Sequence, residues 1–299
     1  MTGSQPDHHR TLRHSLESVR SELRVHGISE WQAEADVLLR HVLGVAISDF
    51  LSLVYGGEDI LTYSQFLRLR ELIDRRLDGE PLAYIVGRRE FYGLDLEVDE
   101  SVLIPRQETE LLVELALDHL TSRYEGHEPT TVVDVGTGSG AVALAISVHA
   151  DDARVIGVDI SPSALAVAMR NRERLPGSGV EFVQGDMLTA IAGPVDVIVS
   201  NPPYIPSETL ASLAVEVRRE PTIALDGGVD GLDQFRRLAT QAGERLAPGG
   251  TLIVELMPEQ MDDAMVTARR YMRNATIVET RLDLMGNRRA IVVMAGPRI

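Results

Sequence analysis

The sequence contains no cysteine and no lysine, and it has no unbroken apolar run of the ~20 residues that a membrane-spanning helix needs. The absence of cysteine excludes disulfides, thiolate metal sites and cysteine nucleophiles. The amino-terminal segment is polar and lacks the apolar core of a secretory signal. We therefore expect a cytoplasmic protein with no metal ion and no membrane partner.

Positive charge is scarce as well, because acidic residues outnumber arginines 45 to 29 and the net charge is −16. Proteins that grip a nucleic-acid backbone neutralise its phosphates with Lys and Arg. Extended duplex binding is thus disfavoured, and we expect no direct nucleic-acid partner, although a local basic patch stays open. The length of 299 residues allows one large domain and a smaller one.

Residues 1–85 carry a helical pattern. Apolar side chains recur at three- and four-residue spacings in Thr11–His26, Glu30–Leu43 and Ser64–Leu77. Glycines separate these segments, as they do at helix ends. The pattern predicts a small amino-terminal helical domain. We recognise no catalytic or binding motif in its sequence.

The spacing of apolar residues along the chain changes from residue 90 onward. The segment 91–98 alternates apolar and polar residues, and the apolar segment 101–104 follows a short acidic turn at Asp99 and Glu100. This pattern predicts a β-hairpin with its turn at those two acidic residues. We assign 86–106 to a hairpin linker between two domains.

Residues 107–299 predict an α/β domain. A helix is expected first, and buried strands then alternate with helices, which is typical of a mostly parallel sheet covered on both faces. The last two strands are joined by a short turn, so one edge is expected to be antiparallel. The expected strands have the sequences TTVVDVG, ARVIGVDI, VEFVQGD, VDVIVS, GGTLIVEL, ATIVETRLD and RRAIVVMA.

A glycine-rich turn follows the first of these strands, and a helix begins directly after it. The turn comprises Gly136, Thr137, Gly138, Ser139 and Gly140. Glycines allow a tight turn and a close backbone approach to a ligand. The spacing departs from the G-x-G-x-x-G of dinucleotide sites, and this departure favours S-adenosylmethionine over a nicotinamide cofactor. An unoccupied structural turn is the remaining alternative.

Three acidic residues and one methionine extend this predicted cofactor site. Asp159 ends the second strand, where a carboxylate can accept hydrogen bonds from a ribose. Asp134 lies two residues before the first glycine and is placed to face the ligand's ammonium group. Asp186 and Met187 end the third strand, where they suit the amine and the face of an adenine ring. A turn aspartate with a core methionine would give the same pattern.

The fourth strand ends in Asn201, Pro202, Pro203 and Tyr204. The two prolines stiffen this corner and remove backbone donors. A planar amino or amide nitrogen needs two acceptors and a flat face, which the Asn201 oxygen, the Pro202 carbonyl and the Tyr204 ring can provide. Such bonds favour release of the nitrogen lone pair for attack on a sulfonium methyl. In register with the glycine turn and Asp159, the corner predicts a methyltransferase acting on such a nitrogen, with catalytic roles for Asn201, Pro202 and Tyr204.

These motifs resemble the HemK/PrmC-type protein-(glutamine-N5) methyltransferases, which modify the glutamine of the GGQ motif in bacterial class 1 peptide chain release factors. The resemblance covers nearly the whole chain. One departure is Gln107, where the family usually has a proline. The resemblance rests on GRREFYG (87–93), LIPRQETE (103–110), DVGTGSG, SNPPYIP, and REP (219–221) with ALDGG (224–228).

The resemblance implies a Rossmann-like class I methyltransferase domain, with a seven-stranded sheet, that follows a substrate-docking helical domain and a hairpin linker. It implies that S-adenosyl-L-methionine contacts Gly136–Gly140, Asp159, Met187 and Asn201, and that S-adenosyl-L-homocysteine is the product. It also implies that Asn201–Tyr204 contact the substrate glutamine.

Three alternatives remain open from the sequence. A DNA adenine-N6 methyltransferase would present the same amine geometry, but base flipping needs a cationic channel. A ribosomal-protein glutamine methyltransferase is a sister possibility, against which the segment PRQETE favours the release-factor branch. A non-catalytic ligand-sensing module is the third alternative, and the intact Asn-Pro-Pro-Tyr sequence argues against it.

Overall fold

The computed structural model describes residues 11–57, 60–122 and 130–297 of the chain. It divides into two compact units, Met1–Gly87 and Arg88–Ile299. Within the described residues, no single helix combines the length and apolar character needed to cross a membrane, and one pair bent by 95°, Trp31–Leu43 with Ile47–Gly56, meets that test on length and composition.

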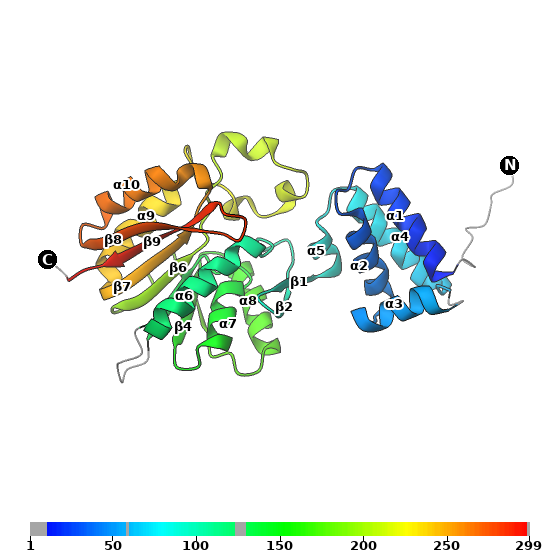
Figure 1. Cartoon of the computed structure of the whole chain (residues 1–299), viewed down its shortest axis with the longest axis horizontal. Coiled ribbons are helices and arrows are strands. Elements are labelled where there is room, and N and C mark those ends of the chain that lie inside the picture. The colour runs from blue at the N-terminus through cyan, green and yellow to red at the C-terminus, as the bar shows by residue number, and fades with distance from the viewer. Residues whose placement is uncertain (1–10, 58–59, 123–129, 298–299) are drawn as a thin grey trace. The chain divides into compact units, whose positions relative to one another are not determined.

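The first unit is built of helices, as the apolar spacing predicts (Figure 1). One leucine-rich core joins them, and it includes Leu16, Leu38 and Leu72. The Thr11 hydroxyl caps the first helix by accepting from the His14 N–H, and Thr62 forms a capping box with Gln65 on the fourth. The helices are α1 (Leu12–Val25), α2 (Trp31–Leu43), α3 (Ile47–Gly56), α4 (Tyr63–Leu77) and α5 (Leu82–Val86).

The predicted hairpin exists, but its position is corrected. Strands β1 (Arg88–Phe91) and β2 (Leu94–Glu97) pair antiparallel around Tyr92 and Gly93. Both turn residues have positive φ, 50° and 76°, which suits the tight two-residue turn that matches strand twist. The expected second strand at 101–104 is not a strand, because the Ile104 N–H donates to the Glu220 carboxylate rather than to a neighbouring strand.

The second unit contains a seven-stranded sheet in the order β5-β4-β3-β6-β7-β9-β8. The pairs from β5 to β7 are parallel, and β9 is antiparallel to both its neighbours, which confirms the predicted antiparallel edge. The strands are β3 (Thr131–Val135), β4 (Arg154–Asp159), β5 (Glu181–Gln184), β6 (Val195–Ser200), β7 (Leu246–Glu255), β8 (Ala275–Leu282) and β9 (Arg288–Ala295).

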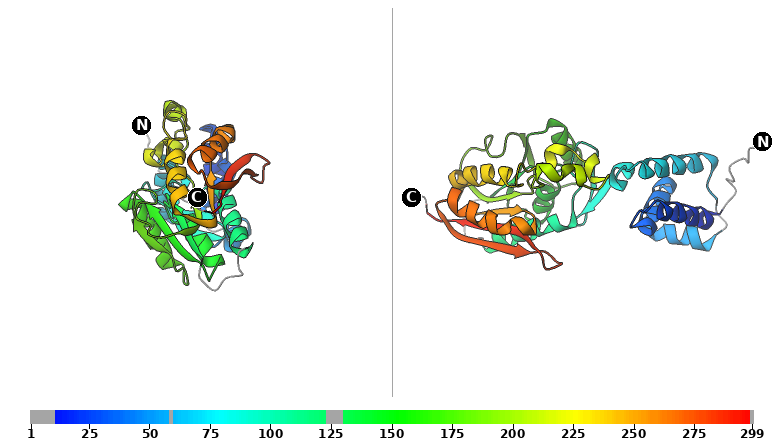
Figure 2. Two further views of the ribbon diagram at one scale, coloured as in Figure 1. Left: turned by 90° about the vertical axis from the view of Figure 1, so that its left-hand side faces the viewer. Right: turned by 90° about the horizontal axis from the view of Figure 1, so that it is seen from above.

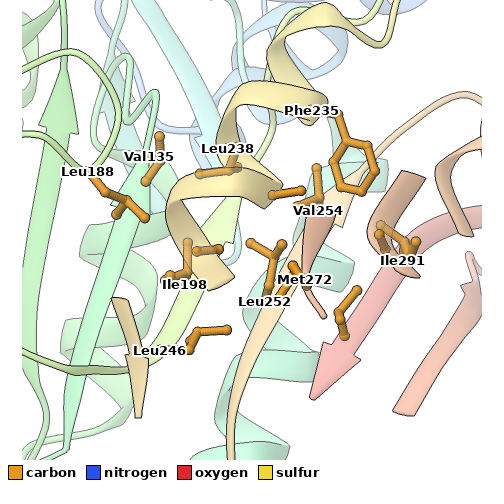
Figure 3. Close-up of a cluster of buried hydrophobic side chains, with 14 of the residues drawn as sticks. Val135, Leu188, Ile198, Phe235, Leu238, Leu246, Leu252, Val254, Met272 and Ile291 are labelled. Carbon is orange, nitrogen blue, oxygen red and sulfur yellow. The ribbon is translucent and has the colours of Figure 1, made fainter. Parts of the chain in front are cut away.

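Helices cover both faces of this sheet (Figure 1 and Figure 2). Successive strand residues point to opposite faces, so Val132 packs with α6 and α7 whereas Val133 packs with α9 and α10. Figure 3 shows the cluster on the face covered by α9 and α10, in which Phe235 and Leu238 of α9 lie against strand residues such as Leu252. The helices are α6 (Glu110–Ser122), α7 (Ala141–His149), α8 (Pro162–Arg174), α9 (Asp233–Arg245) and α10 (Met261–Tyr271).

Candidate active site

A cavity of about 270 Å³ lies in the second unit, where β3, β4, β5 and β6 end. Open parallel sheets bind their ligands at this carboxyl edge. Of the site residues that the sequence predicts, the cavity is lined by Asp134, Gly136, Thr137, Gly138, Ser139, Asp159, Asp186, Met187, Asn201, Pro202 and Pro203. The lining among the described residues does not include Gly140 or Tyr204.

The glycine-rich turn divides into an open part and a packed part. Gly136 and Gly138 have φ of 75° and 54°, and a Cβ on Gly136 would meet no atom within 4 Å. A Cβ on Gly140 would lie 2.9 Å from the Phe182 ring and 3.1 Å from Leu144. Gly140 therefore permits the close approach of α7 to the sheet, while the first two glycines form the cavity wall.

The buried carboxyl of Asp134 holds this turn through hydrogen bonds. Its Oδ2 accepts a hydrogen bond of 2.6 Å from the Thr137 hydroxyl and one of 3.2 Å from the Ala143 N–H. Burial raises the pKa of Asp134 to about 7, against the lowering effect of these two bonds. Asp134 thus lines the cavity, and it also fixes Thr137, the second residue of the turn.

Asp159 is held by backbone donors on both of its oxygens. Oδ2 accepts from the Gly138 N–H and Oδ1 from the Ser161 N–H, each at 2.9 Å. Burial raises the pKa of Asp159, and the N–H bonds from Ser161 and Gly138 act against that rise. A carboxylate has about four lone-pair sites, so Asp159 keeps acceptor capacity toward the cavity.

Asp186 is engaged by a cation that the sequence reasoning missed. Its Oδ2 forms a 2.6 Å ion pair with Arg237 of α9, and both side chains are partly exposed. Arg237 also lines the cavity. It lies 51 residues downstream of Asp186 with no local motif, so only the fold brings the two together.

Met187 adopts a left-handed backbone with φ of 54°, which is unusual for a residue with a side chain. The next residue explains part of this: the Leu188 N–H donates to the Gln241 side chain, whose Nε2 lies 4.0 Å from the Met187 sulfur. Helix α9 therefore orients the methionine at the wall of the cavity.

Asn201 has a defined amide orientation. Its Nδ2 donates to the Thr109 hydroxyl oxygen over 3.1 Å. Because the amide carries its donors on nitrogen and its acceptors on oxygen, this contact leaves the Asn201 Oδ1 as an acceptor. Thr109 is buried in the short helix Gln107–Thr109, and it too lines the cavity.

Tyr204 is not among the described residues that line the cavity, and it is held by hydrogen bonds within the protein. Its hydroxyl donates to Glu255 Oε1 over 3.1 Å, and its carbonyl accepts from Gln260 Nε2 over 2.8 Å. Burial, with the nearby Glu255 charge, raises the pKa of Tyr204. In this structure the tyrosine anchors the corner, and its predicted contact with the substrate stays a prediction.

Another part of the cavity wall is formed by two segments that are far apart in the sequence. The side chain of Glu220, 1% exposed, forms an ion pair with Arg106 and accepts from the Ile104 N–H at 3.0 Å. Burial raises the pKa of Glu220, and the Arg106 charge opposes that rise. The pair fixes two segments that contribute to the cavity lining, the first through residues 101–103 and 105 and the second through residues 221, 223 and 224. Gln107 is the first residue of the following short helix, a position that proline also favours.

Comparisons with known proteins agree with this geometry. Residues 14–87 match the model of the PrmC N-terminal domain, and 108–217 match that of the methyltransferase small domain. The chain is 42% identical over 244 residues to a release factor glutamine methyltransferase of Bradyrhizobium diazoefficiens, covering 81% of this chain and 82% of the relative. The chain belongs to the release factor glutamine methyltransferase family.

A second relative extends this finding over almost the full length. The release factor glutamine methyltransferase of Deinococcus radiodurans is 39% identical over 280 residues, which is 94% of this chain and 97% of that protein. Among solved structures, a methyltransferase from Pyrococcus furiosus matches with a TM-score of 0.50 at 19% identity, over 75% of this chain and 98% of that one. That likeness supports the methyltransferase fold alone.

Proposed function

We propose that this enzyme methylates the side-chain amide nitrogen (N5) of the glutamine in the GGQ motif of a bacterial class 1 release factor, with S-adenosyl-L-methionine as donor. The observation that carries the proposal is the identity of about 40% over most of the chain with release factor glutamine methyltransferases. The position of the Asn-Pro-Pro-Tyr corner on the same cavity as the glycine turn supports it.

The cavity residues suit this donor. Gly136 and Gly138 leave room beside the backbone, and Asp159 offers carboxylate oxygens where two ribose hydroxyls would donate. Met187 provides an apolar surface for an adenine face. When bound, S-adenosyl-L-methionine supplies an electrophilic methyl group on a sulfonium centre.

The chain's own contribution to the reaction is orientation. The Asn201 Oδ1 and the Pro202 carbonyl accept from the two hydrogens of the substrate –NH₂, which holds the amide plane and draws its lone pair out of conjugation. Fixing two reactants in this way is worth roughly 7–11 kcal/mol in favourable cases. Acceptors that strengthen as positive charge develops on the nitrogen add to it.

The charge of the cavity separates this proposal from a DNA adenine-N6 methyltransferase. Arg237 is the one cationic side chain among the described lining residues, and Asp186 neutralises it. A flipped base needs a cationic path for its strand, and the net charge of −16 disfavours one. The amide of a protein substrate requires no such path.

The direct test is incubation of the enzyme with S-adenosyl-L-methionine and a release factor, followed by peptide mass spectrometry. We expect a mass increase of one methyl group on the peptide that contains the GGQ motif. A release factor with that glutamine replaced by alanine serves as the control and should stay unmodified. Methylation of ribosomal proteins or of DNA instead, in parallel reactions, would contradict the proposal.

Asp159→Ala is expected to weaken binding of S-adenosyl-L-methionine by about 10- to 100-fold, because a hydrogen bond to a charged group is worth roughly 1.5–3 kcal/mol. The loss also frees the Gly138 N–H that Asp159 accepts from. Isothermal titration calorimetry measures the effect, with the exposed Asp118→Ala in α6 as the matched control. Unchanged affinity in Asp159→Ala would remove this carboxylate from the site.

The helical unit, predicted at 1–85, is proposed to dock the release factor, with 86–106 as linker and 107–299 as the catalytic domain. The matching family model, the PrmC N-terminal domain at 14–87, supports a distinct amino-terminal module. The cytoplasmic location stays a prediction.

A further inference from the structure

The buried amide of Asn171 joins two segments of the second unit that are far apart in the sequence. Asn171 lies in α8 and is 1% exposed. Its Nδ2 donates to the Ser139 carbonyl at 2.9 Å and to the Glu97 carbonyl at 3.0 Å, and its Oδ1 accepts from the Glu97 N–H at 2.6 Å. Ser139 lies 32 positions and Glu97 74 positions away in the sequence, so the fold brings the three residues together.

These three hydrogen bonds specify an amide at this position. Asparagine carries two donors on its nitrogen and acceptors on its oxygen, and here both donors meet carbonyl oxygens. The reversed amide would turn Oδ1 toward the two carbonyls and Nδ2 toward the N–H, and it would lose all three bonds. An ionised aspartate would accept from the Glu97 N–H but could donate to neither carbonyl. Because a buried polar group without a partner is costly, the site selects asparagine in this one orientation.

The first attachment of Asn171 is to the glycine-rich turn of the proposed cofactor site. Ser139 is buried and lines the cavity. The preceding residue, Gly138, donates its N–H to Asp159 at 2.9 Å. The Ser139 carbonyl and the Gly138 N–H are thus held from two different elements, α8 and β4. A ligand that fixes the position of this turn therefore also acts on Asn171.

The second attachment of Asn171 is to Glu97, the last residue of β2, which precedes the cavity wall. The neighbouring Arg170 donates to the Glu97 carboxylate at 2.5 Å and to Asp99 Oδ2 at 2.8 Å. Asp99 Oδ1 accepts from the N–H of Ser101 at 2.9 Å, and Ser101 lines the cavity. Two successive residues of α8 therefore hold the chain where it enters the cavity wall.

The same stretch of chain continues to the Asn-Pro-Pro-Tyr corner. Pro105 and Thr109 both line the cavity, and the Thr109 hydroxyl accepts from the Asn201 amide at 3.1 Å. Residues 97–109 thus run from the contact with Asn171 to the contact with Asn201. Asn171 is therefore placed between the cofactor turn and the side of the cavity that is proposed to meet the substrate.

We propose that Asn171 is a positioning residue that links the glycine-rich turn to the cavity wall at 97–105, so that cofactor binding and ordering of this wall favour each other. A bound cofactor fixes the turn and with it the Ser139 carbonyl, which holds the Asn171 amide against Glu97. Such a link is reciprocal, so a wall that is fixed in place strengthens cofactor binding in turn. The inference rests on the proposed function, because it takes S-adenosyl-L-methionine as the ligand of the cavity.

The first test measures binding of S-adenosyl-L-homocysteine by calorimetry, since this product binds without turnover. Asn171→Leu keeps a side chain of similar shape but makes none of the three hydrogen bonds, and it should weaken binding about five- to tenfold, the value of roughly one hydrogen bond. The matched control is Ser147→Ala in α7, which removes a buried acceptor of the Gly179 N–H and lies outside the described cavity lining. Ser147→Ala should lower the temperature of unfolding and leave the affinity unchanged.

The second test follows hydrogen exchange of the peptide that covers residues 98–104, with and without saturating S-adenosyl-L-homocysteine. In the wild type, the ligand should slow exchange of these amides, among them the Ser101 N–H that bonds to Asp99, by about threefold or more. In Asn171→Leu, the ligand should still protect the glycine-rich turn but no longer residues 98–104. Ser147→Ala should retain protection of both segments. A residue that only stabilises the fold would change exchange equally with and without ligand.

The outcomes separate this inference from the proposed function. If the wild type does not bind S-adenosyl-L-homocysteine, the proposed cofactor is wrong and the inference fails with it. If the wild type binds the ligand but Asn171→Leu keeps either normal affinity or the ligand-dependent protection of residues 98–104, the link through Asn171 is wrong and the proposed function stands.

A smaller side chain covers the case in which Asn171→Leu does not fold. Asn171→Ala leaves room for a water molecule against the same three backbone groups, and this water is not attached to α8. The same losses of affinity and of ligand-dependent protection are then expected. Unchanged values in Asn171→Ala would overturn the proposal.

Discussion

Asn201→Ala is expected to lower kcat by roughly 10²–10³-fold while cofactor affinity stays within about threefold of the wild type, since loss of one preorganised transition-state contact typically has that effect. The Asn201 Oδ1 is the acceptor left free by the bond from Nδ2 to Thr109. Alanine removes this acceptor and also leaves Thr109 without its donor. The remaining acceptor, the Pro202 carbonyl, holds only one of the two substrate hydrogens.

Single-turnover methyl transfer with labelled cofactor measures the effect on chemistry, and calorimetry measures cofactor binding. Asn287→Ala, in the exposed turn between β8 and β9, is the matched control and should behave as the wild type. Near-normal turnover in Asn201→Ala would show that the corner does not orient the substrate nitrogen.

The sequence predicts the sheet well because each buried strand carries its own signal. A parallel strand covered on both faces needs a nearly continuous apolar run, as in Val132–Val135 and Val195–Val199, each of which is interrupted by a single aspartate. The short connection between β8 and β9 likewise predicts their antiparallel pairing, which the structure confirms. Local pattern is sufficient wherever burial alone decides the conformation.

The hairpin was misplaced because its deciding interactions are not local. The sequence shows an acidic turn at Asp99 and Glu100, but the chain turns at Tyr92 and Gly93. The apolar stretch 101–104 resembles a strand, yet it serves as cavity wall, fixed by Glu220 from 116 residues away. Alternating apolar and polar residues predict that one face of a segment is buried, but they do not identify the residues that cover this face.

The candidate site shows the same division. The motifs identify residues at strand ends, and the cavity brings most of them together. The residues that orient them do not form motifs: Thr109 reaches Asn201 across 92 positions, and Glu255 reaches Tyr204 across 51. Such partners become visible only when the strands and the short helix before α6 are placed in space.

The Asn-Pro-Pro-Tyr corner is also held by the hydrogen bond from Gln260 to the Tyr204 carbonyl, and Gly231 leaves the space that this contact needs. Gly231 has φ of 76°, and a Cβ there would overlap the Tyr204 carbonyl and the Gln260 amide that donates to it. Gly231→Ala is expected to lower the free energy of unfolding by roughly 2–5 kcal/mol. About 1–2 kcal/mol comes from the left-handed backbone and about 1–3 kcal/mol from the overlap.

Gly286→Ala isolates the backbone contribution in the same unit. Its φ of 82° is nearly the same, but no atom lies within 4 Å of the added Cβ. It should therefore cost only about 1–2 kcal/mol. Urea unfolding of the two variants measures the difference, and methyl transfer should fall further in Gly231→Ala because the displaced Tyr204 backbone adjoins the two prolines. Equal losses of stability would mean that the Tyr204 carbonyl moves freely, and that the corner is not held from this side.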